Sequence, residues 1–139
     1  MKSGFLCLQT HPEHAGLVRV MTQEILPELT KRDEQMPYRY VARFEDIEAA
    51  QMHLHNCMRR GLVDLENRIY RGELEHMIAC VEADDLDHAR IWLDPALADE
   101  ASLRIKSLVA RMRATRRRHD RIWQAVGIAA ILMLLLSSF

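Results

Sequence analysis

The side chains best suited to binding a metal ion are seven histidines and three cysteines. His53 and His55 are two positions apart in a predicted helix, so they point about 200° apart and cannot share one ion. His11 and His14 lie in a predicted turn, with no cysteine spaced nearby for a metal site. We therefore predict solvated or packed histidines, no resident metal and no cofactor.

Cys7, Cys57 and Cys80 are far apart in the sequence and odd in number. A disulfide framework usually has an even set of cysteines in a smaller, secreted chain. Cysteine is also common as a small buried apolar residue. We expect three reduced, structural thiols in a reducing compartment. The acidic run at residues 82–87 lacks the alternating ligands and the glycine of a calcium loop, so it predicts a solvated helix end.

Charge divides the chain of 139 residues into three parts. Residues 1–103 hold 11 Lys and Arg against 19 Asp and Glu, a net charge of −8. Residues 104–121 hold eight basic residues against one acidic residue, a net charge of +7, and residues 122–139 hold no charge. This composition excludes a long disordered chain, a collagen-like repeat and a multidomain enzyme. It fits one small domain with additions.

Residues 122–139 form a predicted helix that is apolar on every side. Eighteen residues span about 27 Å as a helix, near the short limit for a bilayer core of about 30 Å. The alternative is a buried core helix, for which the rest of the chain is hardly large enough. The predicted membrane-surface residues are Arg111, Arg113, Arg116, Arg117, Arg118, Arg121 and Trp123.

Arginines before the apolar run, with no charge after it, place the N-terminal domain in the cytoplasm by the positive-inside rule. We predict a single-pass, tail-anchored protein of the inner, cytoplasmic membrane, with membrane lipid as one partner. The arginines also suggest a nucleic-acid patch, but no aromatic residues interleave with them. Contact with anionic headgroups is therefore the preferred interpretation.

Apolar periodicity and chain breakers predict the elements that precede the anchor. Aromatic and β-branched residues predict strands at 5–8, 17–20, 38–44, 68–71 and 90–93. Helices are predicted from Asp46, from about Leu74, and from about Ala98 through the anchor, with a further possible helix between the second and third strands. The order predicts an α+β domain with a mostly antiparallel sheet at residues 1–96, a basic juxtamembrane helix at 97–121 and a transmembrane anchor at 122–139.

An apolar stripe follows the juxtamembrane helix with spacings of three and four: Ala101, Ile105, Leu108, Met112 and Thr115. It is too short to predict a coiled coil. The stripe predicts either packing on the domain or a weak homodimer through residues 98–119.

Three segments resemble the GIY-YIG endonuclease superfamily, in its phage-type and meiotically up-regulated-gene-type branch. Residues 4–20 read GFLCLQTHPEHAGLVRV and resemble the family's opening strand, Asn-Pro turn and Pro-Gly-Leu-Val segment. Residues 48–55 resemble its helix ending in Leu-His, and residues 67–75 resemble its Arg-Glu-Phe-Phe strand. The resemblance covers about residues 4–82 and implies a small GIY-YIG-like α+β domain.

The resemblance also implies a set of site residues. In that family a tyrosine, a lysine, a helical arginine, a histidine and a metal-binding glutamate surround the scissile phosphate. The tyrosine falls on Cys7, the lysine on Arg19, the histidine on His55 and the glutamate on Arg68. If the family geometry is kept, these four side chains converge on one shallow concave surface.

The departures at these positions argue against catalysis. Arg68 puts a permanent cation where the family has a metal ligand, and Cys7 lacks the reach of a phenol. Arg32 lies too late to be the helical arginine, while Glu66 is conceivable as a shifted ligand. The set can hold an anion without cleaving it.

Two functions therefore remain open. The first is a catalytically inactive, tail-anchored GIY-YIG-like binding module at the cytoplasmic membrane face, with an unknown protein partner. The alternative is a membrane-tethered GIY-YIG-type endonuclease dependent on Mg²⁺, or a nucleic-acid-binding protein. A net charge of −8 on residues 1–103 repels a polyanion, which makes nucleic acid the less expected partner.

Overall fold

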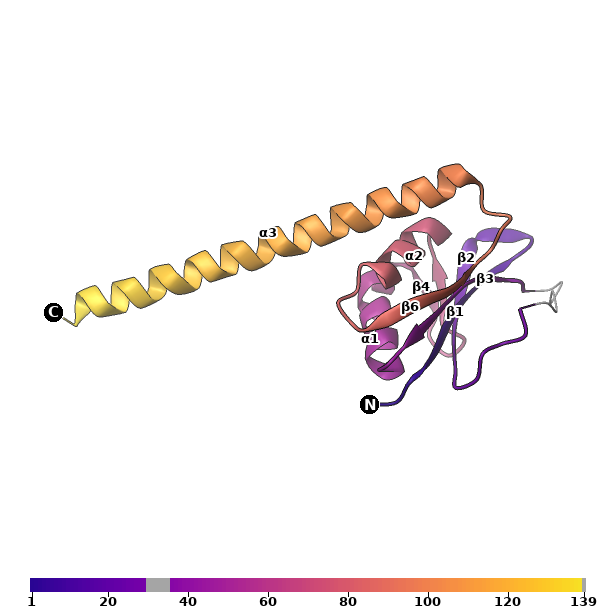
Figure 1. The fold of residues 1–139 in the computed structure, drawn as a ribbon, viewed down its shortest axis with the longest axis horizontal. Helices are drawn as coiled ribbons and strands as arrows, with labels where there is room; N and C mark the ends of the chain where they lie inside the picture. The colour runs from indigo at the N-terminus through magenta and orange to yellow at the C-terminus, as the bar shows by residue number, and fades with distance from the viewer. Residues whose placement is uncertain (30–35, 139) are drawn as a thin grey trace.

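The computed structural model describes residues 1–29 and 36–138 (Figure 1). In chain order its elements are β1 (Gly4–His11), β2 (His14–Gln23), β3 (Tyr38–Phe44), α1 (Ile47–Met58), β4 (Leu62–Asp64), β5 (Ile69–Arg71), α2 (Leu74–Glu82), β6 (His88–Leu93) and α3 (Asp99–Ser137). The predicted strands and the three main helices are confirmed. The further helix is absent from the described residues 24–29, and the rest of that segment, with Arg32, lies outside the described residues.

The strands form one antiparallel sheet in the order β4-β5-β2-β1-β3-β6. β1 lies inside the sheet, with Cys7 opposite Met21 of β2 and Val41 of β3. β5 joins the other edge of β2, where Tyr70 lies opposite Val18. The α+β class with an antiparallel sheet is therefore as predicted.

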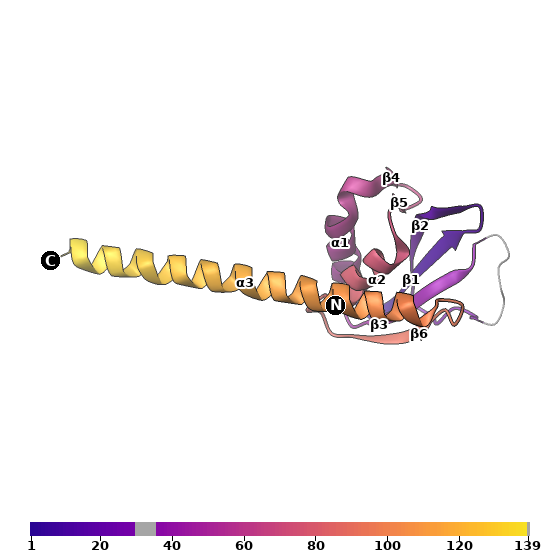
Figure 2. The ribbon, with the colours of Figure 1, turned by 90° about the horizontal axis from the view of Figure 1, so that it is seen from above.

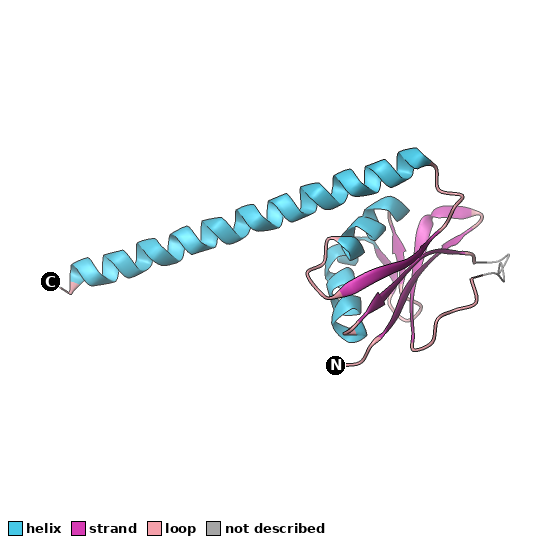
Figure 3. Cartoon of the chain, in the orientation of Figure 1, coloured by secondary structure: helices cyan, strands magenta, loops and turns pink. Residues whose placement is uncertain are grey.

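The hydrophobic core lies between one face of this sheet and the two short helices (Figure 3). Alternate strand residues such as Leu6, Leu8 and Tyr40 point into it and are completely buried. Successive side chains of a strand point to opposite faces, so their neighbours Cys7 and Val41 belong to the other face. Both of these are also completely buried, but outside this core.

Local sequence explains why α1 forms where it does. Asp46 caps its N-terminus by accepting the backbone N–H of Ala49 at 3.2 Å. Apolar residues then recur every three or four positions, and the buried ones are Ile47, Ala50, Leu54 and Met58. In α2 the predicted inward residues Leu74, Met77, Ile78 and Val81 are all buried.

The two short helices are also linked covalently. A disulfide joins Cys57 of α1 to Cys80 of α2, with 6.5 Å between the Cα atoms. The expectation of three separate thiols is therefore wrong for this pair. Sequence separation concealed the link, because the two residues become neighbours only when α1 and α2 pack together.

The helix α3 is one continuous rod that begins on the domain and extends away from it (Figures 1 and 2). Ile105 is fully buried and Val109 is 9% exposed, and both belong to the core of the domain. Leu108 and Met112 pack against the same core. The predicted packing of the stripe on the domain is confirmed, and the homodimer alternative would need the same face of the helix.

The part of α3 that extends beyond the domain is exposed. Every described residue from 113 to 138 is exposed. Within the described part of the chain, α3 is the helix that is long and apolar enough to cross a membrane, and none of its apolar window of 18 residues is buried. This fits a single-pass membrane protein.

Candidate functional site

Arg68 directly precedes β5 and has an unusual backbone conformation. Its φ is 53°, in the left-handed region that residues with a Cβ rarely adopt. Its carbonyl oxygen accepts the backbone N–H of Val20 at 3.0 Å, which fixes the residue against β2. Strained residues persist where their surroundings hold them, and they cluster at functional sites. The backbone thus holds one guanidinium in a defined place.

The Arg68 side chain lies between β2 and α1. Its Nη1 donates to the Thr22 hydroxyl oxygen at 3.2 Å. With the Gln51 amide turned so that its oxygen faces the guanidinium, this oxygen accepts from Nε at 3.1 Å and from Nη2 at 3.2 Å. Both acceptors are neutral, so they orient the guanidinium without cancelling its positive charge.

His55 and Tyr70 border the same hollow of about 350 Å³, which we call the Arg68 pocket. Tyr70 Oη lies 2.8 Å from His55 Nδ1. Burial raises the pKa of the Tyr70 phenol, although the charge of Arg68 lowers it. A phenol that stays protonated can donate to His55. Glu48, Gln51 and Met52 of α1 and Leu65 of the β4–β5 turn complete the lining of the pocket.

A second hollow of about 190 Å³ also borders Arg68. It is lined by Arg19 and its neighbours on β2 and by Glu66 and Asn67 of the β4–β5 turn. Arg68 therefore borders His55 in one hollow and Arg19 in the other. Three of the four expected site residues lie along one surface, with Arg68 at its centre.

Cys7 does not join them, and the prediction that it would is wrong. Leu6 and Leu8 point toward α1 and α2, so Cys7 between them points to the opposite face of the sheet. His55 lies on the helical side, because its partner Tyr70 belongs to the core there. Complete burial also raises the pKa of the Cys7 thiol to about 12, which leaves it unreactive at neutral pH.

Each hollow beside Arg68 is lined by one carboxylate, Glu48 in the larger and Glu66 in the smaller. Among the residues that the structure describes, neither belongs to a group of three or more His, Cys, Asp or Glu ligand atoms within 4.8 Å of one another. A fixed guanidinium beside an imidazole and a phenol suits an anionic ligand better than a hard divalent cation. The Arg68 pocket can therefore hold a phosphate-like or carboxylate group.

The remaining histidine predictions concern residues away from this pocket. His53 Nδ1 lies 2.9 Å from Asp84 Oδ2, so His53 and His55 have different partners, as their spacing predicts. In the β1–β2 turn the ligand atoms of His11, Glu13 and His14 lie within 4.8 Å of one another. His11 Nδ1 there already accepts the backbone N–H of Glu13 at 3.1 Å.

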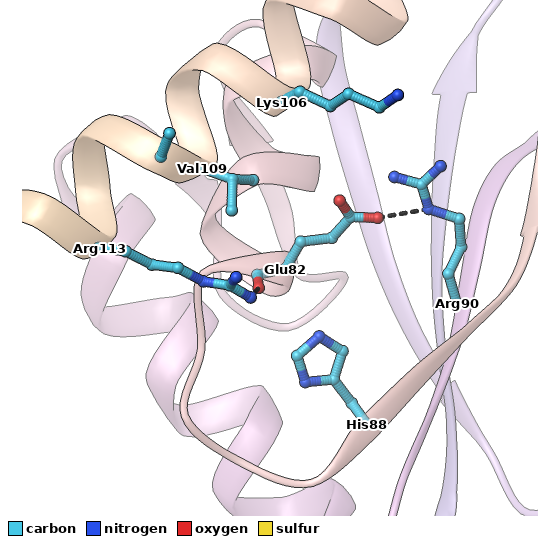
Figure 4. A pocket seen from close by; sticks show the side chains of 7 residues that line it. Glu82, His88, Arg90, Lys106, Val109 and Arg113 are labelled. Atoms are coloured by element: carbon cyan, nitrogen blue, oxygen red, sulfur yellow. Dashed lines mark hydrogen bonds and ion pairs between the residues drawn. The ribbon is translucent and has the colours of Figure 1, made fainter.

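Sequence reasoning missed a further pocket, of about 430 Å³, which lies between α2, β6 and α3, apart from the two hollows beside Arg68 (Figure 4). Glu82 lies at its centre and accepts from Arg90 Nε at 2.5 Å. Lys106 and Arg113 of α3 and His88 of β6 also line the pocket, and Arg113 donates to the backbone carbonyl of Glu82 instead of its carboxylate. Three cationic side chains thus line the pocket together with the Glu82 carboxylate, which pairs with Arg90. The spacing of these residues in the sequence gives no sign of the pocket, which depends on α3 packing across the sheet and α2.

Two of the predicted membrane-surface arginines contact the domain instead of only facing lipid. Arg113 Nη2 donates to the Glu82 carbonyl oxygen at 2.8 Å, and Arg116 Nη1 donates to that of Ala83 at 3.2 Å. These carbonyls end α2, where a cation also complements the helix dipole. Arg116 in addition pairs with Asp85 at 2.7 Å. Arg111, Arg117, Arg118 and Arg121 remain predicted lipid contacts, with Trp123 donating to His119 at 2.7 Å.

Comparison of the chain with models of known protein families, with curated proteins and with solved structures finds no match.

Proposed function

We propose that this protein is a membrane-anchored binding module, held at the cytoplasmic face by α3, which binds an anionic group of a protein partner without cleaving it. The observation that carries the proposal is the continuity of α3. One helix runs from Ile105, in the core of the domain, to an exposed apolar end. The domain and the proposed anchor are therefore joined by one unbroken helix, with no flexible linker within it.

The charge distribution supports the cytoplasmic orientation. The arginines lie on the side of the apolar segment that faces the domain, and cytoplasmic flanks carry an excess of such residues. Attraction to anionic lipid adds about 1 kcal/mol per charge near the surface.

The geometry of Arg68 supports binding of an anion without catalysis. If the resemblance to the GIY-YIG superfamily holds, this guanidinium replaces the family's metal-binding carboxylate. The position of the family's tyrosine, Cys7, faces away from the pocket. The remaining groups bind negative charge but supply neither a metal ion nor the phenol on the first strand.

The test of anion binding uses the full chain in detergent micelles and inorganic phosphate as the probe. Phosphate should raise the thermal unfolding temperature relative to chloride at equal ionic strength, because a ligand bound by the folded state stabilises it. Arg68→Gln should abolish the shift. Arg60→Gln, at an exposed arginine of the turn after α1, is the matched control and should keep it. An equal shift in both variants would contradict the proposal.

The alternative, a membrane-tethered metal-dependent nuclease, is favoured by one observation. Glu48 and His55 border the same pocket, and Glu66 lies in the adjoining one, so carboxylates are within the neighbourhood of the expected site. Incubation of the full chain with DNA and Mg²⁺ or Mn²⁺ tests this. Metal-dependent cleavage that His55→Ala abolishes would replace the binding-module proposal, whereas intact DNA would support it.

A further inference from the structure

A group of soft metal-binding side chains lies at the junction of α1 and α2, apart from the Arg68 pocket. Cys57 comes from the last turn of α1, while His76 and Cys80 are four residues apart on α2 and share one face of that helix. His76 Nε2 lies 3.8 Å from Cys80 Sγ, and the three ligand atoms lie within 4.8 Å of one another. Two sulfurs and one imidazole thus converge from two helices.

Solvent reaches this group. Cys57 is exposed, and His76 and Cys80 are half-buried. By contrast, Cys7 is completely buried on the other side of the sheet. A reductant or a metal ion can therefore reach the Cys57–Cys80 disulfide, whereas the third cysteine is protected.

We propose that, once the Cys57–Cys80 disulfide is reduced, Cys57, Cys80 and His76 bind one Zn²⁺-like soft divalent ion. The proposal rests on the cytoplasmic orientation given above, because that compartment keeps thiols reduced. Two molecules of a thiol reductant supply two electrons and two protons, become a disulfide themselves, and leave two cysteine thiols. Both thiols lose their protons when the ion binds.

The distances and the ligand chemistry favour zinc. Zn–S bonds of about 2.3 Å and Zn–N bonds of about 2.0–2.1 Å in a tetrahedron place sulfur and nitrogen about 3.6 Å apart. The existing separation of 3.8 Å between His76 Nε2 and Cys80 Sγ is close to that value. Thiolate ligands select Zn²⁺ over Mg²⁺ or Ca²⁺, which prefer oxygen.

Three protein ligands leave the fourth position of the ion open to water or to an external ligand. The ion would also replace the covalent link between α1 and α2 when the disulfide is reduced. The two helices are then tied together in either redox state.

The experiment uses the full chain in detergent micelles, reduced with dithiothreitol, which is then removed under argon. Titrated Co²⁺ should give one thiolate-to-cobalt charge-transfer band at one ion per chain, and Zn²⁺ should displace it. Cys57→Ser and Cys80→Ser should lose the band. His76→Gln should weaken binding by about tenfold or more, as loss of metal-site partners typically does. Cys7→Ser and His53→Gln are the matched controls and should keep it.

Absence of the band in the reduced chain, or an unchanged band in Cys57→Ser, would overturn the metal site. Circular dichroism of each variant separates loss of a ligand from loss of the fold. The orientation is tested separately, by alkylating thiols in intact cells before lysis. A disulfide found in the cells would contradict the cytoplasmic orientation, while the cobalt titration would still decide the metal site.

Discussion

The two halves of α3 share one backbone and differ completely in their surroundings. In the first half, Ile105 and Val109 are buried, and charged residues on the same helix contact α2. In the second half, large apolar side chains such as Leu134 and Leu136 are 70% and 78% exposed. A helix that is apolar on one stripe fits a protein core, whereas one that is apolar all round requires an apolar surrounding medium.

The comparison shows that helix propensity alone does not separate the halves. No glycine or proline interrupts α3 from Asp99 to Val126, so the backbone continues across the boundary between the two halves. What differs is the angular distribution of apolar residues. The transition lies at the arginines, where the helix leaves the domain and where lipid headgroups are expected.

The largest expected effect is loss of membrane attachment. Deletion of residues 122–139 should move the protein from the membrane pellet to the soluble fraction, because a spanning helix is the strongest of the available anchors. Fractionation after a high-salt wash measures this. As a control, glutamine at Arg117 and Arg118 should leave the protein in the pellet. A truncated protein that still sediments would show that the second half is not the anchor.

The next effect concerns where the folded unit ends. The predicted boundary at residue 96 leaves Ile105 and Val109 outside the domain, although both lie in its core. A fragment of residues 1–116 should therefore have a free energy of unfolding about 3–6 kcal/mol above that of residues 1–96, at about 1.5–3 kcal/mol per buried aliphatic side chain. Urea denaturation of both fragments measures the difference. Equal midpoints would support the boundary at 96.

A single substitution sharpens the same comparison. Ile105→Ala should lower the free energy of unfolding of the domain by about 2–5 kcal/mol, because it leaves a cavity in a packed core. Ile128→Ala, which makes the same chemical change in the exposed half, should change domain stability by less than about 0.5 kcal/mol. Thermal unfolding in micelles gives both values. Similar losses in the two variants would remove the distinction between the halves.

The smallest expected effect concerns the contact between α3 and the end of α2. Arg113→Ala should destabilise the domain by about 1 kcal/mol or less, because its hydrogen bond to the Glu82 carbonyl is solvent-exposed. Arg118→Ala is the control at an exposed position where lipid contact is predicted, and it should leave the stability of the domain unchanged. A loss of several kcal/mol at Arg113 would mean that this contact is needed to dock α3.

Local patterns predicted most of the fold. Asp46 as a cap and the spacing of Leu74, Met77 and Ile78 defined their helices, because those signals lie within one element. The strand β4 was missed because it has three residues and is partly exposed, so it offers no alternation to detect.

The candidate site was less predictable because it depends on packing. The strand that contains Cys7 was predicted from its residue types, but the neighbours Leu6 and Leu8 decide which face of the sheet Cys7 occupies. The Cys57–Cys80 link and the contact from Arg113 to Glu82 join residues 23 and 31 positions apart, across different elements. No local periodicity carries that information.

If α3 spans a membrane as proposed, its unbroken backbone also fixes how the domain can meet another molecule there. From Val109 to Ile122 the helix rises about 20 Å, so it sets the height of the domain above the lipid surface. Each residue also turns the helix by about 100°, so the length of the helix sets the direction, around the helix axis, in which the Arg68 pocket faces. One residue inserted after Arg118 would raise the domain by only about 1.5 Å but turn the pocket away from a partner embedded in the same membrane.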